Sequence, residues 1–235
     1  MSGREPILNL PRSLLVLCTA MILVHLARQL VGPDTDLWII AEFAFVPARY
    51  SAPSEWPGGF PALFWTPLTY AFLHGDAIHL LVNLLWAASF GTPVARRLGA
   101  ARFLLLGAGA AVAGAAAHYL VYPGDAVPMI GASAAVSGMT AATARFAFAP
   151  GGPLGGGGGS PSAYLVPAPP LPALLANGRA AFFVLIWFGV NLLFGVQSSL
   201  IPGVAGAIAW QAHIGGFLAG LALFPLLDPV RRLPG

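Results

Sequence analysis

Polar side chains in otherwise apolar stretches of this sequence have the chemistry of a hydrolytic site: His79, Asn83, Ser133 and His213. A serine hydroxyl becomes a nucleophile when a neighbouring base takes its proton, and neutral histidine can serve as that base near pH 7. Ser133 and His213 are therefore a candidate nucleophile and general base. His79 and Asn83 are four residues apart, so on a helix they share one face. Their imidazole and amide N–H groups are suited to stabilising an oxyanion.

The pattern predicts a Ser–His dyad rather than a triad. No Asp or Glu lies at the depth of these residues in any apolar stretch, so no carboxylate is available to orient the imidazole. Ser133 follows Gly131 at a predicted helix start, where free backbone N–H groups and the helix dipole favour a developing oxyanion. Taken singly, Ser133 or His213 could instead bond a backbone carbonyl and serve packing alone.

The elements that must position these side chains are predicted to be membrane-spanning helices. The chain has 235 residues, 57% hydrophobic and 8% charged, whereas soluble domains carry roughly 25% charged residues. This composition excludes an ordinary soluble enzyme, and a bilayer core of about 30 Å needs about 20 apolar residues per helix. The predicted fold class is an all-α polytopic membrane bundle, with six spans at 13–31, 68–91, 102–121, 130–149, 180–199 and 205–227. The first stretch is expected to be a retained span, because its apolar run is longer than the roughly 7–15 residues of a signal peptide.

The arginines predict the orientation of the bundle. With the N-terminus inside, nine of the eleven basic residues fall on the inner side and only Arg28 and Arg49 on the outer side. Because inner loops carry the excess of basic residues, segments 1–12 and 228–235 are predicted to be cytoplasmic. The basic residues are scattered rather than clustered, which argues against a nucleic-acid partner.

Two long connections join the spans. Residues 32–67 form an outer loop rich in Trp, Phe and Pro, which is interpreted either as an interfacial anchor or as a surface that contacts substrate. Residues 150–178 are rich in Gly and Pro and include five consecutive glycines at 155–159, so they are predicted to be a flexible cytoplasmic linker.

Topology and packing both bring the polar residues together. Spans two, four and six are predicted to run from outside to inside, which places all four polar side chains within about two helical turns of the outer ends. Gly216 and Gly220 form a small-xxx-small pair that lets the sixth helix approach a partner closely. The fourth span offers a matching face of small residues, and Gly131 at its start is also assigned to packing.

At these residues the sequence resembles the rhomboid family of intramembrane serine proteases. The resemblance covers about residues 13–227 and rests on His74-x4-His79-x3-Asn83, Gly131-Ala132-Ser133, and Ala212-His213-Ile214-Gly215-Gly216 with Gly220. It implies a six-helix rhomboid-like domain in which Ser133 is catalytic, His213 is the general base, and His79 and Asn83 support the oxyanion. It also implies single-span or polytopic membrane-protein substrates, cleaved near the outer bilayer face without a metal or a cofactor. The Ala-, Gly-, Pro- and Arg-rich composition without Lys indicates a GC-rich bacterial genome and hence a bacterial inner membrane.

The sequence departs from the family pattern at three positions. Ala134 stands where a glycine usually follows the serine, and Ser137 where an aromatic residue often packs on the histidine ring. Thr66 follows Trp65 in place of the arginine common in the first outer loop, so the arginine contact cannot be carried over.

Other functions would require different residues at these positions. An inactive rhomboid-like protein that only binds membrane helices would typically lack the serine or the histidine. A metal-dependent protease needs two histidines four apart with a glutamate, whereas His74 and His79 are five apart. An aspartyl protease needs two facing carboxylates, and Asp125 has no partner in the sequence pattern. A transporter would predict internal repeats or charged residues along a path.

Overall fold

The described part of the chain is helical. The computed structural model describes residues 9–197 and 209–230, and within these the only β-structure is an isolated bridge between Phe45 and Met129. The all-α prediction is therefore confirmed for this part. The α-helices are α1 (Arg12–Gln29), α2 (Pro33–Phe43), α3 (Ala62–Thr69), α4 (Ala77–Trp86), α5 (Thr92–Leu98), α6 (Ala100–Val121), α7 (Ser133–Ala147), α8 (Leu171–Ala176), α9 (Gly178–Gln197) and α10 (Trp210–Leu227).

Several of these helices have the length and apolarity of membrane spans. Within the described residues, four continuous helices qualify: α1, α4 continued through η4 (Ala87–Gly91) into α5, α6, and α10. In α9 the apolar portion is Gly178–Leu193, and α7 has 15 residues. An integral membrane protein follows from these helices, while the count of six spans and the orientation stay predictions. Much of the predicted termini 1–12 and 228–235, and the junction between the fifth and sixth predicted spans, lie outside the described residues.

The second apolar stretch begins its helix at Ala77 rather than at residue 68. Residues before it form α3 and a short turn, η3 (Tyr70–Phe72), and the chain then bends before α4. Asp76 caps α4, because its Oδ1 accepts a hydrogen bond from the His79 backbone N–H at 2.8 Å. Apolarity continues across this bend, so hydropathy alone could not locate it.

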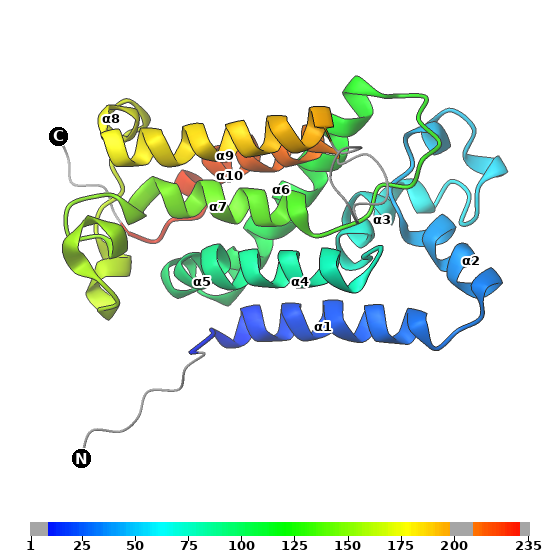
Figure 1. Cartoon of the computed structure of the whole chain (residues 1–235), viewed down its shortest axis with the longest axis horizontal. Coiled ribbons are helices and arrows are strands. Elements are labelled where there is room, and N and C mark those ends of the chain that lie inside the picture. Colours follow the sequence, from blue (N-terminus) through cyan, green and yellow to red (C-terminus); the bar gives the residue numbers. More distant parts are fainter. Residues whose placement is uncertain (1–8, 198–208, 231–235) are drawn as a thin grey trace, which may run out of the picture.

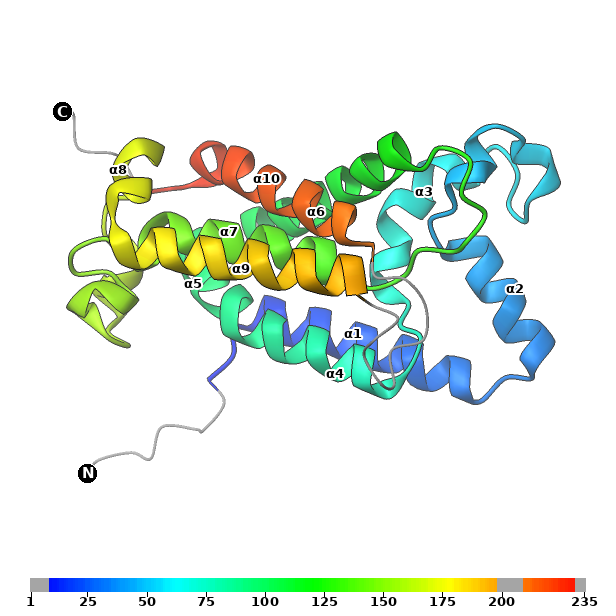
Figure 2. The same cartoon turned by 45° about the horizontal axis from the view of Figure 1, so that its top comes forward.

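Helix α7 lies at the centre of the bundle. It packs against α6, α10 and η4, and every residue from Val136 to Ala147 is buried. Most of its side chains are small, which lets the neighbouring helices approach its backbone closely. In Figures 1 and 2, α4, α7 and α10 all begin at the end of the bundle where α2 and α3 lie. The residues at the starts of these three helices therefore share one end of the molecule.

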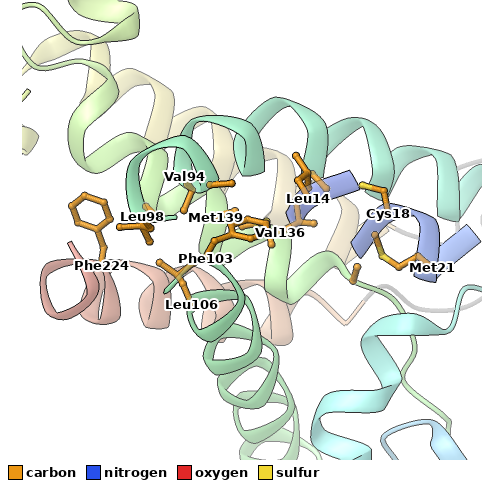
Figure 3. Packing of buried hydrophobic residues seen from close by; sticks show 14 of the residues in the cluster. Leu14, Cys18, Met21, Val94, Leu98, Phe103, Leu106, Val136, Met139 and Phe224 are labelled. Atoms are coloured by element: carbon orange, nitrogen blue, oxygen red, sulfur yellow. The ribbon is translucent and has the colours of Figure 1, made fainter. Parts of the chain in front are cut away.

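A continuous cluster of buried side chains joins α7 to the surrounding helices. Leu14 and Met21 of α1, Leu106 of α6, Met139 of α7 and Phe224 of α10 belong to this cluster. Figure 3 shows these residues meeting along the length of the bundle. Because the lipid is as apolar as these side chains, their contribution comes mainly from close packing rather than from exclusion of water.

Residues 32–67, which the sequence predicts to be an outer loop, hold their aromatic side chains in two environments. Phe45 is buried against the bundle, whereas Trp38, Phe60 and Phe64 are exposed. The exposed rings have the placement expected of interfacial residues. Both predicted roles, substrate contact and interfacial anchoring, require such exposed rings.

The Gly- and Pro-rich segment 150–178 is more structured than the flexible linker that the sequence predicts. It contains two short helical turns, η5 (Pro153–Gly157) and η6 (Pro161–Leu165), followed by α8. The backbone freedom of the glycines favours flexibility, but side chains outside the segment bind its carbonyl groups.

Arg97 of α5 is one of the residues that anchor this segment. Its Nη1 donates to the carbonyl oxygens of Tyr164 and Val166 at 2.7 and 2.8 Å. Its Nε and Nη2 donate to the two carboxylate oxygens of Asp228 at 2.9 and 2.8 Å. This bidentate pair is buried, and such a geometry gives both strength and direction. One guanidinium therefore ties α5, the Gly- and Pro-rich segment and the end of α10 together.

Candidate active site

Ser133 and His213 lie side by side although 80 residues separate them in the sequence. Ser133 is the first residue of α7, and His213 is in the first turn of α10. The Ser133 Oγ and His213 Nε2 atoms are 2.8 Å apart, the length of a good hydrogen bond. The structure thus brings together the two residues that the sequence predicts as nucleophile and base.

A seam of small residues makes this approach possible. A Cβ atom on Gly216 would lie 2.1 Å from the Ala134 carbonyl oxygen, and one on Gly220 would lie 2.2 Å from the Gly138 carbonyl oxygen. Both distances are far inside van der Waals contact with backbone that cannot easily move. Glycines at these two positions let α10 lie directly on α7, and so place His213 within reach of Ser133.

Asn191 is a site residue that the sequence analysis missed. Its Oδ1 lies 2.6 Å from His213 Nδ1, and its Nδ2 donates to the Trp187 carbonyl at 2.7 Å. The group that contacts the far side of the imidazole is thus a neutral amide rather than the carboxylate of a Ser–His–Asp triad. The available signal was an uncharged but strongly polar residue within the apolar stretch of α9, which calls for a partner in a membrane.

His79 lies against the turn that leads into Ser133. Gly131 has φ +121°, and a Cβ there would be 2.7 Å from His79 Nε2. Glycine is required here both by the backbone conformation and by the proximity of the ring. The assignment of Gly131 to packing therefore has a specific partner, the imidazole of His79.

His74, the first residue of the His74-x4-His79-x3-Asn83 pattern, also belongs to this neighbourhood. It is fully buried, its ring meets the His79 ring edge-on with centroids 5.1 Å apart, and its Nε2 accepts a long hydrogen bond of 3.5 Å from the Ala132 backbone N–H. Helical spacing predicts that His74 points away from His79. That spacing does not apply, because His74 precedes the Asp76 cap and is not part of α4.

Asn83 lies one turn beyond His79 on the same helix and is buried. Its Nδ2 donates to the His79 carbonyl at 3.0 Å, which uses one of the two amide N–H groups. No direct side-chain hydrogen bond to Ser133 or His213 is found for His79 or Asn83 among the described residues. Their contribution would be to an incoming group rather than to the Ser–His pair itself.

Ser137, the second serine of α7, has a different environment. Its Oγ donates to the Ser133 carbonyl at 2.7 Å, and the residue is buried. The hydroxyl is therefore occupied with the backbone of its own helix. Ser133 is the serine of this helix that a histidine contacts.

Comparison with known proteins supports the resemblance seen in the sequence. A model of the rhomboid domain matches residues 61–228. The rhomboid protease GluP of Bacillus subtilis (strain 168) is 32% identical over 117 residues, which is 50% of this chain and 21% of the relative. "Putative rhomboid protease YdcA" of the same organism is 38% identical over 76 residues, 32% of this chain and 38% of the relative. The aligned regions thus span less than half of either relative. Since the rhomboid domain covers most of this sequence, including α4, α7, α9 and α10, the chain belongs to the rhomboid family.

Proposed function

We propose that this protein is an intramembrane serine endopeptidase that cleaves transmembrane segments of membrane proteins. The observation that carries the proposal is the 2.8 Å contact between Ser133 Oγ and His213 Nε2. Two relatives named as rhomboid proteases support it at the level of the family.

The proposed reaction follows from the positions of the two side chains. His213 Nε2 takes the hydroxyl proton while Ser133 Oγ attacks the scissile carbonyl, and the imidazolium then gives that proton to the leaving amine. Water enters next, loses a proton to Nε2 and hydrolyses the acyl-enzyme. The oxyanion would be stabilised by free backbone N–H groups at the start of α7 and by His79 and Asn83.

The proposed substrates are single-span or polytopic membrane proteins, cleaved from the outer side of a bacterial inner membrane. Support for a site near one membrane surface comes from α4, α7 and α10, which begin at the end of the bundle where the exposed aromatic rings of residues 32–67 lie. Aromatic rings of this kind favour the headgroup level. Water for deacylation would reach Ser133 from that end.

The test uses purified protein in liposomes with a model single-span substrate and a fluorophosphonate probe. The wild type is expected to give two complementary fragments, and the probe is expected to label Ser133. Ser137→Ala is the matched control, because Ser137 is on the same helix with its hydroxyl bonded to a carbonyl; it should be labelled like the wild type. Labelling at Ser137, or binding of the substrate without any cleavage, would contradict the proposal. The second result would favour an inactive rhomboid-like protein.

Asn83→Ala is expected to slow cleavage by about 10²-fold or less, because Asn83 is one of several proposed oxyanion donors. Ser89→Ala is a suitable control, since Ser89 also bonds a carbonyl four residues earlier but is exposed. The rate constant kcat on the reconstituted substrate measures the effect. A much larger loss in a variant with unchanged Tm would show that Asn83 has a role other than oxyanion support.

A further inference from the structure

We propose that Asn191 is a positioning residue for His213: its amide oxygen selects the tautomer and ring orientation in which Nε2 accepts the Ser133 proton. This inference rests on the proposed peptidase function. It adds a fourth helix, α9, to a site otherwise built from α4, α7 and α10.

The hydrogen bonds of Asn191 define the direction of its amide. Asn191 Nδ2 donates to the Trp187 carbonyl at 2.7 Å, so Oδ1 is the atom that faces His213 Nδ1 at 2.6 Å. A flipped amide would place its oxygen against the Trp187 carbonyl and lose that bond. Because an amide oxygen only accepts, Nδ1 must carry the proton of the neutral ring. The Nε2 lone pair is then free to accept the Ser133 hydroxyl proton.

Aromatic packing holds the two helices at the distance this bond requires. The rings of Trp187 and Phe217 stack with centroids 4.2 Å apart, and Phe188 meets Phe217 edge-on at 5.2 Å. Trp187 lies one turn before Asn191, and Phe217 lies one turn after His213. The polar pair is therefore next to a buried aromatic contact between the same two helices. Hydrogen bonds are stronger in such a low-dielectric environment, and the loss of a partner is more harmful.

An amide and a carboxylate would not act identically at this position. Both accept the Nδ1 proton and orient the ring, but the neutral amide adds no negative charge to stabilise the imidazolium that forms during the reaction. Cysteine proteases of the papain type use an asparagine behind the histidine in this way. Asn191 is thus expected to act through orientation alone.

The first test measures the tautomer directly. Histidine residues are labelled with ¹⁵N in the full-length protein in lipid, and the His213 signal among the five histidines is identified by its loss in His213→Ala. The wild type is expected to show protonated Nδ1 and unprotonated Nε2 at neutral pH. Asn191→Leu, which removes the acceptor at similar volume, is expected to give a mixture of tautomers. A wild-type ring protonated on Nε2 would overturn the proposal, and this measurement does not depend on the variant being folded.

The second test separates positioning from substrate binding. Asn191→Leu is expected to lower kcat by about 10- to 100-fold with KM unchanged, less than the roughly 10⁴-fold loss for a serine-protease histidine held in the wrong tautomer. Asn191→Asp keeps an acceptor, and its kcat is expected to be at least about tenfold higher than that of Asn191→Leu. Leu192→Ala is the control, because Leu192 is the next residue on α9 and its side chain is 58% exposed.

The outcomes distinguish this inference from the proposed function. Cleavage that requires Ser133 and His213 but is unchanged in Asn191→Leu would refute the role of Asn191 alone. Equal kcat values for the aspartate and leucine variants at unchanged Tm would do the same. Cleavage that persists in Ser133→Ala would refute the peptidase assignment, while the tautomer measurement would still report on the Asn191–His213 bond.

Discussion

Ser133→Ala is expected to lower kcat/KM for a reconstituted single-span substrate by about 10⁴- to 10⁶-fold, and His213→Ala by a similar factor. The hydroxyl supplies the attacking oxygen and the imidazole accepts its proton. Because both act in the same step, the loss of either side chain abolishes that step. For the same reason the effects should not multiply. The double variant is expected to be about as slow as either single variant. Quantified fragment yields over long incubations measure all three rates.

Ser137→Ala is the appropriate control for these variants and should retain wild-type kcat/KM. Its hydroxyl is buried and bonds the Ser133 carbonyl rather than His213. Cleavage by Ser133→Ala at more than a trace of the wild-type rate would exclude Ser133 as the nucleophile. Single-variant effects that multiply in the double variant would show that Ser133 and His213 act independently.

Gly216→Ala is expected to damage both stability and activity. The added methyl group would lie 2.1 Å from the Ala134 carbonyl oxygen, so α10 must move away from α7. Overpacking of this kind costs about 2–3 kcal/mol, which corresponds to a fall of about 4–12 °C in Tm at roughly 2–4 °C per kcal/mol. Because this displacement separates His213 from Ser133, cleavage should also fall by about 10²-fold.

Gly189→Ala makes the same chemical change without the clash. Gly189 lies within α9, and a Cβ there would have no heavy atom within 4 Å. Alanine is a better helix former than glycine by about 1 kcal/mol, so the Tm of this variant should stay level or rise and cleavage should be unchanged. Thermal unfolding in lipid and the cleavage assay compare the two variants. Equal Tm values would contradict a close glycine seam between α7 and α10.

The sequence predicts the helical fold well where apolar runs are long and uninterrupted. Helices α1 and α6 begin and end within two residues of their predicted bounds. The start of α4 differs, because apolar residues continue through α3 and η3 and only the Asp76 cap marks the new helix. Helix α7 shows a limit of hydropathy as a guide to membrane spans. It is enclosed by protein rather than by lipid, so it needs small side chains and less hydrophobicity than a lipid-facing helix.

In the candidate site too, the sequence predicts some residues and not others. Ser133 and His213 are predictable because polar groups of complementary chemistry at one depth rarely serve packing alone. Asn191 is harder to recognise, since an amide that bonds the carbonyl of the preceding turn resembles an ordinary helix residue. The contact between His74 and His79 does not follow from their five-residue spacing, because a bend before the Asp76 cap separates His74 from α4. The partners of both residues lie on other segments of the chain, so they become visible only in the folded structure.

The Arg97 contacts also bear on how the two halves of the chain stay together. The run of glycines at 155–159 separates the half that contains Ser133 from the half that contains His213. Arg97 precedes this run, yet it holds the Tyr164 and Val166 carbonyls and Asp228, all of which follow it. Covalent continuity through the glycines is therefore not what keeps nucleophile and base adjacent. A break in the peptide chain there would leave the halves joined by a buried ion pair at one end and by the contact of α7 with α10 along their length.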